Sequence, residues 1–446
     1  MPSESLTQSL PFDPAEPKAL LAQLPEAAAV FALYGAEAHA EPYIGRTPNL
    51  RGRLERLLQP SAKHPRRLQL AGRVRRIEYK LTGSDFESLL LQFELLETVY
   101  GTKAPGQSLT RMHLGSPAFV RYLGSNAYPR ITVTNRPSQR EAAWCYGPFP
   151  SRAAAERYAD EALKLFLLRR CTEDLEPNPS HPGCVYSEMK MCLAPCYKGC
   201  TDERYGAEAA AVEGFLATRG ESRLTQLRGE RDEASANLEF EAAASIHAQV
   251  QRVEAVRGLA AEIVRPLSQL RAVVLQVAAQ ADEVAVFLYE HGRLRGPVGF
   301  SVLGMRIQNE QSGSSSLFAQ PMALEPVPEE TGIRGQGSEI RGQGSGISVQ
   351  GSGVRDQGAA ARLARGVLEA RMDAALAALA ADPAPPSAAV RQAHLALLKR
   401  WYYRTEARRP GEVYFPDGEG RWPVKGMLRG VGRVFASAFK SPAAAS

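Results

Sequence analysis

Four cysteines lie close together near the middle of the chain and have the spacing of a metal or cluster site. They are Cys171, Cys184, Cys192 and Cys196, all within 26 residues of a 446-residue chain that holds six cysteines. In a reducing compartment, clustered thiols ligate metals more often than they form disulfides. Zinc and a [4Fe-4S] cluster both accept four thiolates, so the spacing by itself favours neither. For Cys145 and Cys200, packing or a spare surface thiol is the simplest interpretation.

A second group of residues, near the N-terminus, forms a series of short motifs. In chain order they are Ala29-Val30-Phe31, Tyr43-Ile44-Gly45, Asn49-Leu50-Arg51-Gly52-Arg53 and the string FESLLLQFELL. In this order they resemble the GIY-YIG nuclease module. The resemblance implies phosphodiester hydrolysis, with the Tyr43 hydroxyl near the attacking water, Arg53 neutralising the phosphorane and one divalent metal, Mg²⁺ or Mn²⁺.

Two positions depart from the pattern of that module. Phe31 stands where the family has its first Tyr, and Gln92 stands where the family has its metal-binding Glu. A neutral amide binds Mg²⁺ far less well than a carboxylate does. On a helix, Glu87 and Glu94 point roughly 140° and 160° away from Gln92, so neither replaces it simply. The nuclease is therefore active only if Gln92 is tolerated.

Positive charge is concentrated in one part of the chain. The whole chain has 54 Lys and Arg against 48 Asp and Glu, whereas residues 43–80 hold 11 basic and two acidic side chains, a local charge of +9. This excess predicts a footprint for nucleic-acid phosphates, with a solvated arginine-rich surface as the alternative. In addition to the catalytic candidate Arg53, six arginines of this segment are candidate DNA-binding residues: Arg46, Arg51, Arg56, Arg73, Arg75 and Arg76.

Further motifs extend the resemblance along the chain. GPFPS, then a helix that ends in LRRC, then PGCVYSEMKMCLAPC and LEFEAAASIHAQVQRVEAV closely resemble the middle of UvrC, an excinuclease of bacterial nucleotide excision repair. The resemblance implies a [4Fe-4S] cluster on Cys171, Cys184, Cys192 and Cys196, with zinc as the alternative. It also identifies residues 238–256 as a UVR-like motif, which pairs UvrC with UvrB.

The UVR-like stretch has the pattern of an amphipathic helix. Apolar positions recur at spacings of four and three from Leu238 to Val256, so the helix must bury this stripe against another element. A hairpin with residues 223–236 and docking to a partner helix are both compatible with the pattern. The predicted partner-binding residues are Leu238, Phe240, Ile246 and Val253.

The chain is expected to be an α/β protein of several units. Residues 1–24 are expected to be a loose lead-in. The predicted units are a small GIY-YIG-type α/β domain (25–100), a Cys-cluster domain (128–202), a helical UVR-like segment (203–264), a strand-rich remnant (268–330), a disordered Gly/Gln/Ser repeat (331–358) and a C-terminal helical or mixed segment (359–446). Within the first unit the patterns predict strands at 27–34, 41–45 and 68–79, and helices at 49–58 and 84–98. Ser84 and Ser151 are expected to cap helices, YGPFPS at 146–151 is expected to be a turn, and His291-Gly292 is expected to be a hairpin turn.

Composition and absent patterns restrict the function further. The chain is 44% hydrophobic and 23% charged, which is typical of a globular protein. It has no apolar run long enough for a membrane helix and no basic, apolar leader, which predicts a cytoplasmic protein without a membrane partner. No spaced Asp, Asp and His set follows the repeat, so the family's RNase H-like and helix-hairpin-helix parts are expected to be lacking. The sequence therefore predicts a DNA repair protein that either cuts DNA or acts as a non-catalytic adaptor for DNA and a UvrB-like partner. A third hypothesis, a redox sensor, is supported only by the cysteines.

Overall fold

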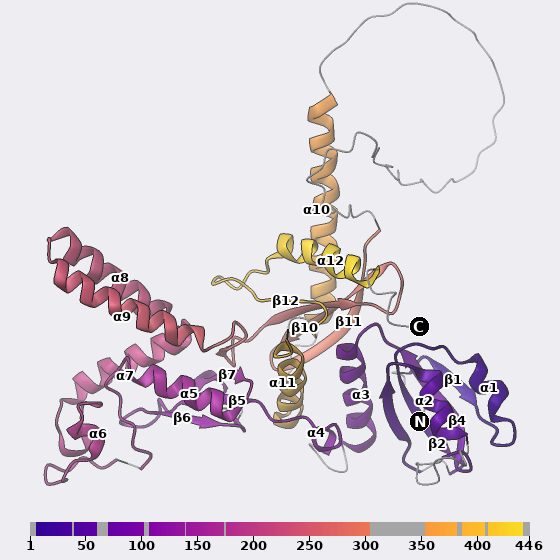
Figure 1. The fold of residues 1–446 in the computed structure, drawn as a ribbon, viewed down its shortest axis with the longest axis horizontal. Coiled ribbons are helices and arrows are strands. Elements are labelled where there is room, and N and C mark those ends of the chain that lie inside the picture. The colour runs from indigo at the N-terminus through magenta and orange to yellow at the C-terminus, as the bar shows by residue number, and fades with distance from the viewer. Residues whose placement is uncertain are drawn as a thin grey trace, which may run out of the picture.

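The computed structural model describes residues 6–37, 40–59, 70–101, 107–138, 140–173, 175–303, 353–380, 386–405 and 409–439. They form a mixed α/β protein with three four-stranded sheets (Figure 1). The predicted α/β class is therefore confirmed. None of the described helices is long and apolar enough to cross a membrane. Most of the predicted repeat, up to residue 352, lies outside the described residues.

The N-terminal sheet has the strand order β1-β4-β2-β3 and is antiparallel throughout. Its elements are β1 (Gln8–Pro11), α1 (Pro17–Gln23), β2 (Ala29–Gly35), β3 (Tyr43–Thr47), α2 (Leu50–Leu58), β4 (Val74–Leu81) and α3 (Asp85–Tyr100). The predicted strands and helices of this unit are present, but the third predicted strand, 68–79, begins only at Val74, because residues 71–73 form a turn. The expectation that residues 1–24 form a loose lead-in is wrong. Strand β1 pairs with β4, and the fully buried Leu21 holds α1 in the core.

Strand alternation gives this sheet two distinct apolar faces. Phe31 and Leu33 of β2 pack with Leu54 of α2 on one face. Val30 of β2 packs with Leu91 of α3 on the other face. Because successive side chains of a strand point to opposite faces, α2 and α3 cover opposite sides of the sheet.

Helix α3 begins at a side-chain cap and is buried on two sides. The Ser84 hydroxyl accepts from the Glu87 N–H at 3.1 Å, as predicted, while the Glu87 carboxylate accepts from the Gly83 N–H at 2.8 Å. Away from the N-terminal sheet, the Phe86 ring lies 5.0 Å from Phe287 and 5.4 Å from Trp401, centroid to centroid. The helix therefore joins the N-terminal sheet to the C-terminal part of the chain.

The middle of the chain builds a second sheet, with the order β6-β5-β7-β8. Its elements are α4 (Gln107–Arg111), β5 (Ala118–Tyr122), β6 (Ile131–Thr134), η1 (Ala142–Trp144), β7 (Cys145–Phe149), α5 (Arg152–Leu163), α6 (Val185–Glu188), η2 (Pro195–Tyr197), α7 (Asp202–Ala217) and β8 (Arg265–Pro266). GPFPS was expected to be a turn, but much of it belongs to β7, which pairs with β5 in the buried core. The predicted cap at Ser151 is confirmed, since its hydroxyl accepts from the Ala154 N–H.

A helical hairpin and a third sheet complete the fold. The hairpin consists of α8 (Glu221–Ala236) and α9 (Phe240–Gly258), and it projects from the body (Figure 1). The third sheet has the order β11-β10-β9-β12, with β9 (Ala272–Val277), β10 (Glu283–Glu290), β11 (Arg293–Ser301) and β12 (Glu412–Tyr414). The predicted His291-Gly292 turn is confirmed, with φ values of 51° and 79°. Helices α10 (Gly353–Ala380), α11 (Ala388–Tyr402) and α12 (Val424–Phe439) pack around it, and α10 begins six residues before the predicted start at residue 359.

Candidate active site

Three of the four residues predicted for a nuclease site meet on the α2 side of the N-terminal sheet. An Arg53 Nη atom of α2 donates to the Tyr43 hydroxyl of β3 at 3.3 Å. The Phe31 ring of β2 lies 6.2 Å from the Tyr43 ring, centroid to centroid. Helix α2 holds Arg53 there because its first turn is capped by Asn49, whose side chain accepts from the Gly52 N–H at 2.8 Å.

Gly45 lets the Phe31 ring lie against β3. The two residues are paired across β2 and β3, and a Cβ on Gly45 would be 2.7 Å from Cζ of Phe31. Such a contact is shorter than a carbon–carbon contact allows, so the ring requires glycine here. Phe31 is completely buried and has no hydroxyl, which leaves Tyr43 as the phenol of this group.

Gln92 is not joined to these residues. It lies on α3, whose Leu91 contacts the opposite face of the sheet from Phe31 and Tyr43. Its side chain is partly exposed and makes no hydrogen bond within the described part of the chain. The structure therefore assembles Tyr43, Arg53 and Phe31 but gives Gln92 no contact with them.

Two carboxylates of α3 face Lys80 of β4. Glu87 and Glu94 are seven residues apart, which is close to two helical turns, so they lie on one side of the helix. Burial raises the pKa of Glu94 to about 7, although the Lys80 charge opposes this, and burial also raises the pKa of Glu87. No group of three or more Cys, His, Asp or Glu side chains among the described residues is arranged to hold a metal ion.

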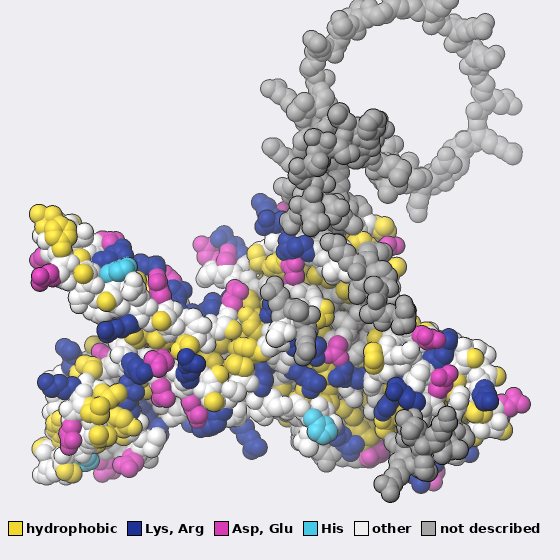
Figure 2. All heavy atoms as spheres, viewed as in Figure 1, with side chains coloured by type: hydrophobic (Ala, Val, Ile, Leu, Met, Phe, Trp, Pro, Cys, Tyr) yellow, Lys and Arg dark blue, Asp and Glu magenta, His cyan; other side chains and the backbone are white. Residues whose placement is uncertain are grey.

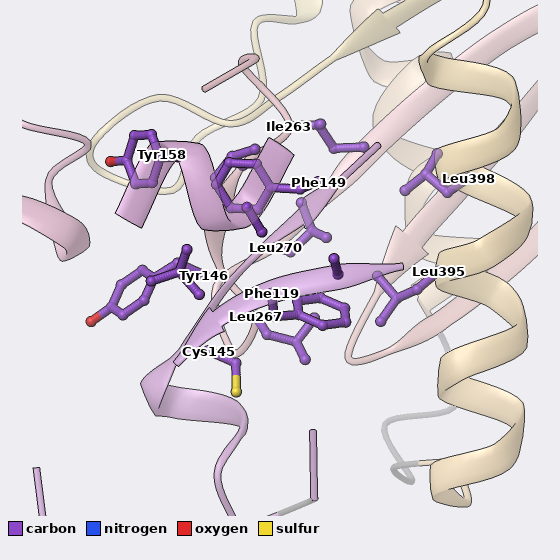
Figure 3. Packing of buried hydrophobic residues seen from close by; sticks show 14 of the residues in the cluster. Phe119, Cys145, Tyr146, Phe149, Tyr158, Ile263, Leu267, Leu270, Leu395 and Leu398 are labelled. Carbon is purple, nitrogen blue, oxygen red and sulfur yellow. The ribbon is translucent and has the colours of Figure 1, made fainter. Parts of the chain in front are cut away.

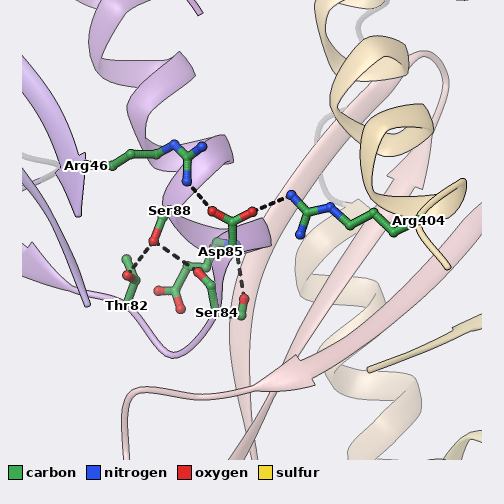
Figure 4. Close-up of polar contacts among 7 residues, drawn as sticks. Arg46, Thr82, Ser84, Asp85, Ser88 and Arg404 are labelled. Atoms are coloured by element: carbon green, nitrogen blue, oxygen red, sulfur yellow. Dashed lines mark hydrogen bonds and ion pairs between the residues drawn. The ribbon is translucent and has the colours of Figure 1, made fainter. Parts of the chain in front are cut away.

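Half of the predicted DNA-binding arginines already have carboxylate partners. Arg46 is paired with Asp85, which also accepts from Arg404 at 2.5 Å (Figure 4). Arg51 pairs with Glu26 at 2.6 Å. Arg76 pairs with Glu78 at 3.1 Å. In contrast, Arg56, Arg73 and Arg75 are exposed and have no carboxylate partner within the described residues, so they form the accessible part of the basic segment.

Asp85 and Arg404 are the residues that the sequence did not single out. They are 319 positions apart, and Arg404 follows the end of α11. Burial acts to raise the pKa of Asp85, but the hydrogen bonds and charges of Arg404 and Arg46 outweigh it and hold this pKa below its ordinary value. No local pattern could have found this pair, because the contact exists only once α3 packs beside α11.

The four predicted thiol ligands lie around α6 and η2. Cys196 is buried, and Cys171, Cys184 and Cys192 are partly exposed. Burial raises the pKa of Cys192 and Cys196, an effect opposed by backbone N–H groups of residues 194, 196 and 197, and each of the two senses the charges of Cys171 and Cys184. The Arg169 guanidinium donates to the Cys171 sulfur at 3.4 Å. The donors suit a four-thiolate group chemically, although the described side chains do not form a closed ligand shell.

The predicted partner-binding residues divide between the surface and the core. Leu238 and Phe240 are 72% and 67% exposed at the outer end of the hairpin, where apolar side chains gather (Figure 2). Val253 is 1% exposed, and Ile246 is partly buried against the main core. The hairpin of residues 223–236 with the UVR-like helix is confirmed, so Val253 cannot reach a partner unless the hairpin opens.

Comparison with known proteins assigns the middle of the chain. Residues 119–215 match the family described as UvrC/Cho excinuclease, middle domain. The UvrABC system protein C of Alcanivorax borkumensis is 31% identical over 215 residues, which is 48% of this chain and 34% of the relative. That of Desulforudis audaxviator is 29% identical over 333 residues, 71% of this chain and 52% of the relative. The chain is UvrC-like.

The UvrC-like chain thus spans about a third to a half of the length of these relatives. The matched region contains β5 from its second residue, β7, α5 and all four clustered cysteines. No solved structure matches the chain.

We predict that Glu94→Gln makes the UvrC-like chain more stable above neutral pH. Because the folded-state pKa of Glu94 is raised to about 7, the folded protein favours the protonated carboxyl, so this group's contribution to stability falls as the pH rises from about 4.5 to 7. The variant removes that loss, a gain on the order of 1–3 kcal/mol at pH 8. Urea unfolding at pH 5 to 8 measures it. Glu55→Gln, with the same charge change on α2, is the control, and equal pH dependence of the two variants contradicts the prediction.

Proposed function

We propose that this protein acts in nucleotide excision repair as a UvrC-like DNA-binding protein with a degenerate GIY-YIG endonuclease site. The observation that carries the proposal is the match of residues 119–215 to the UvrC middle domain. The Tyr43–Arg53 pair supports it, because a phenol and a guanidinium on one surface are suited to a scissile phosphate.

The second candidate is a non-catalytic adaptor that binds DNA and a UvrB-like partner. Gln92 and Phe31 favour it, since one lacks the carboxylate and the other the hydroxyl of a competent site. In both candidates the partner binds the exposed end of the hairpin through Leu238 and Phe240. Mg²⁺ or Mn²⁺ belongs only to the catalytic candidate.

We expect the unmodified protein to nick lesion-bearing duplex DNA weakly or not at all. Loss of a metal ligand removes several kcal/mol of transition-state stabilisation, on the order of a thousandfold in rate. If the degenerate-nuclease candidate holds, Gln92→Glu together with Phe31→Tyr should raise metal-dependent nicking, whereas the adaptor candidate, which the lack of contact between Gln92 and the Tyr43–Arg53 pair favours, predicts no gain. Nicking is measured on supercoiled and lesion-bearing duplex with Mg²⁺ or Mn²⁺.

Arg53→Ala in the restored background is the matched control and should abolish the gain. Robust cleavage by the unmodified protein that Arg53→Ala removes would reject the adaptor. No cleavage by the restored double variant would reject the degenerate nuclease in favour of the adaptor.

DNA binding is proposed for the unpaired arginines of the basic segment. Arg73→Gln and Arg75→Gln should each weaken binding and reduce the slope of log affinity against log salt by about 0.9, because each removes one phosphate contact. Arg46→Gln is the control, and it should lower stability rather than the salt slope, since Arg46 is paired with Asp85. The slopes are measured by fluorescence anisotropy between 50 and 200 mM salt, about the range over which phosphate contacts change the affinity strongly. An affinity independent of salt contradicts the footprint.

A [4Fe-4S] cluster with a structural role is proposed for Cys171, Cys184, Cys192 and Cys196. Four thiolates would anchor the cluster, and its binding would contribute folding free energy. Protein purified without oxygen should be brown and contain equal amounts of iron and sulfide. Cys192→Ser should lose the colour, whereas Cys145→Ser, outside the set, should keep it. Colourless protein with one zinc would overturn the iron cluster and retain the four-thiolate site.

A further inference from the structure

A cavity of about 410 Å³ lies at the base of the helical hairpin, away from the candidate active site. Its walls include Tyr146 of β7, Tyr158 of α5, Arg219 in the turn between α7 and α8, and Glu254 and Arg257 of α9. The cavity is not lined by Tyr43, by Arg53 or by any of the four clustered cysteines. Cavities of about 300–1,000 Å³ are of the size that binds small organic ligands.

The cavity carries one positive charge that no described carboxylate neutralises. Arg257 pairs with Glu221 at 3.0 Å, and Glu254 is occupied by Arg228 at 2.9 Å. The Arg219 side chain has neither a hydrogen bond nor an ion pair among the described residues, and its Nε atom is buried without a partner. A buried N–H without an acceptor is costly, and an anion that accepts a hydrogen bond from this partly buried guanidinium removes that cost.

Two tyrosine hydroxyls complete a set of donors. In Figure 3 the hydroxyls of Tyr146 and Tyr158 point to the same side, away from Phe149 and Leu270 of the apolar cluster. Burial raises the pKa of both phenols, so both are protonated and able to donate. Arg219 and Arg257 line the same cavity as Tyr158, and their charges lower the pKa of Tyr158 against the larger effect of burial.

The backbone at Arg219 is strained. Its φ is +54°, the left-handed region, and Gly220 follows with φ +83° where α7 ends. The Gly220 N–H bonds to the Phe215 carbonyl at 2.6 Å, as in turns that close a helix. Glycine or asparagine is favoured at such positions, so an arginine here suggests that its side chain is needed.

We propose that this cavity binds a phosphate monoester of nucleotide size, with the guanidiniums of Arg219 and Arg257 and the hydroxyls of Tyr146 and Tyr158 around the phosphoryl group. A guanidinium presents several N–H donors in a plane that fits phosphate oxygens. The apolar wall, which includes Leu216 and Val264, faces the remainder of the ligand. The phosphate belongs either to a free nucleotide or to the 5′ end of a DNA strand.

Calorimetric titration of the full chain tests the proposal. The probes are inorganic phosphate, deoxyadenosine 5′-monophosphate, and a short oligonucleotide with or without a 5′-phosphate. We expect saturable binding of the monophosphate, and Arg219→Leu should raise its Kd at least tenfold. Arg252→Leu removes an equal charge from an exposed position of α9 and should leave Kd unchanged.

Arg219→Gly separates binding from folding. Glycine relieves the left-handed strain, so the thermal midpoint in phosphate-free buffer should equal or exceed that of the unmodified protein while binding is lost. A lower midpoint would show that Arg219 is structural and would overturn the proposal. The absence of binding by every phosphate probe at millimolar concentration, or an equal loss in Arg252→Leu, would also overturn it. Tighter binding of the phosphorylated oligonucleotide than of the monophosphate identifies a strand end as the source, and the reverse identifies a free nucleotide.

Discussion

Helix α3 is buried on two opposite sides, and both halves of the molecule pack against it. Leu91 and Leu95 belong to the small cluster under Val30, whereas Phe86, Leu89 and similar residues belong to the main core. A helix with apolar side chains on two opposite sides must bury both of them to be stable. The N-terminal sheet and the C-terminal part therefore depend on each other for stability, because removing either would expose large apolar side chains of α3.

This enclosure also determines which charges remain available. Asp85 begins α3 at the boundary of the two halves and receives both Arg46 and Arg404. A carboxylate between two guanidiniums leaves an overall positive group, but its arginines are held by the fold. The arginines of the basic segment that remain accessible are therefore Arg56, Arg73 and Arg75, which lie outside this boundary.

In the proposed GIY-YIG site Gln92 stands where a metal-binding Glu is expected, and a neutral amide at this position has its own physical consequence on such a helix. Burying an ionised carboxylate is costly unless it is paired or binds a metal. Helix α3 already carries Glu87 and Glu94, whose pKa values are raised by burial. A neutral amide at position 92 adds no further charge to a helix that is enclosed on two sides, whereas a third carboxylate would depend on a metal for compensation.

The sequence by itself determined the local structure: the caps at Ser84 and Ser151, the turn at His291-Gly292 and the helical periodicity of residues 238–256. These follow from hydrogen bonds and periodicities among residues near one another in the chain. It also identified Tyr43 with Arg53. Only the tertiary structure decided that β1 joins the N-terminal sheet, that Arg46 is held by Asp85, that Val253 is internal and that Arg219 is left without a carboxylate among the described residues. Each depends on contacts between distant segments, whose geometry is set by the packing of α3 and the sheets and not by the residues on either side.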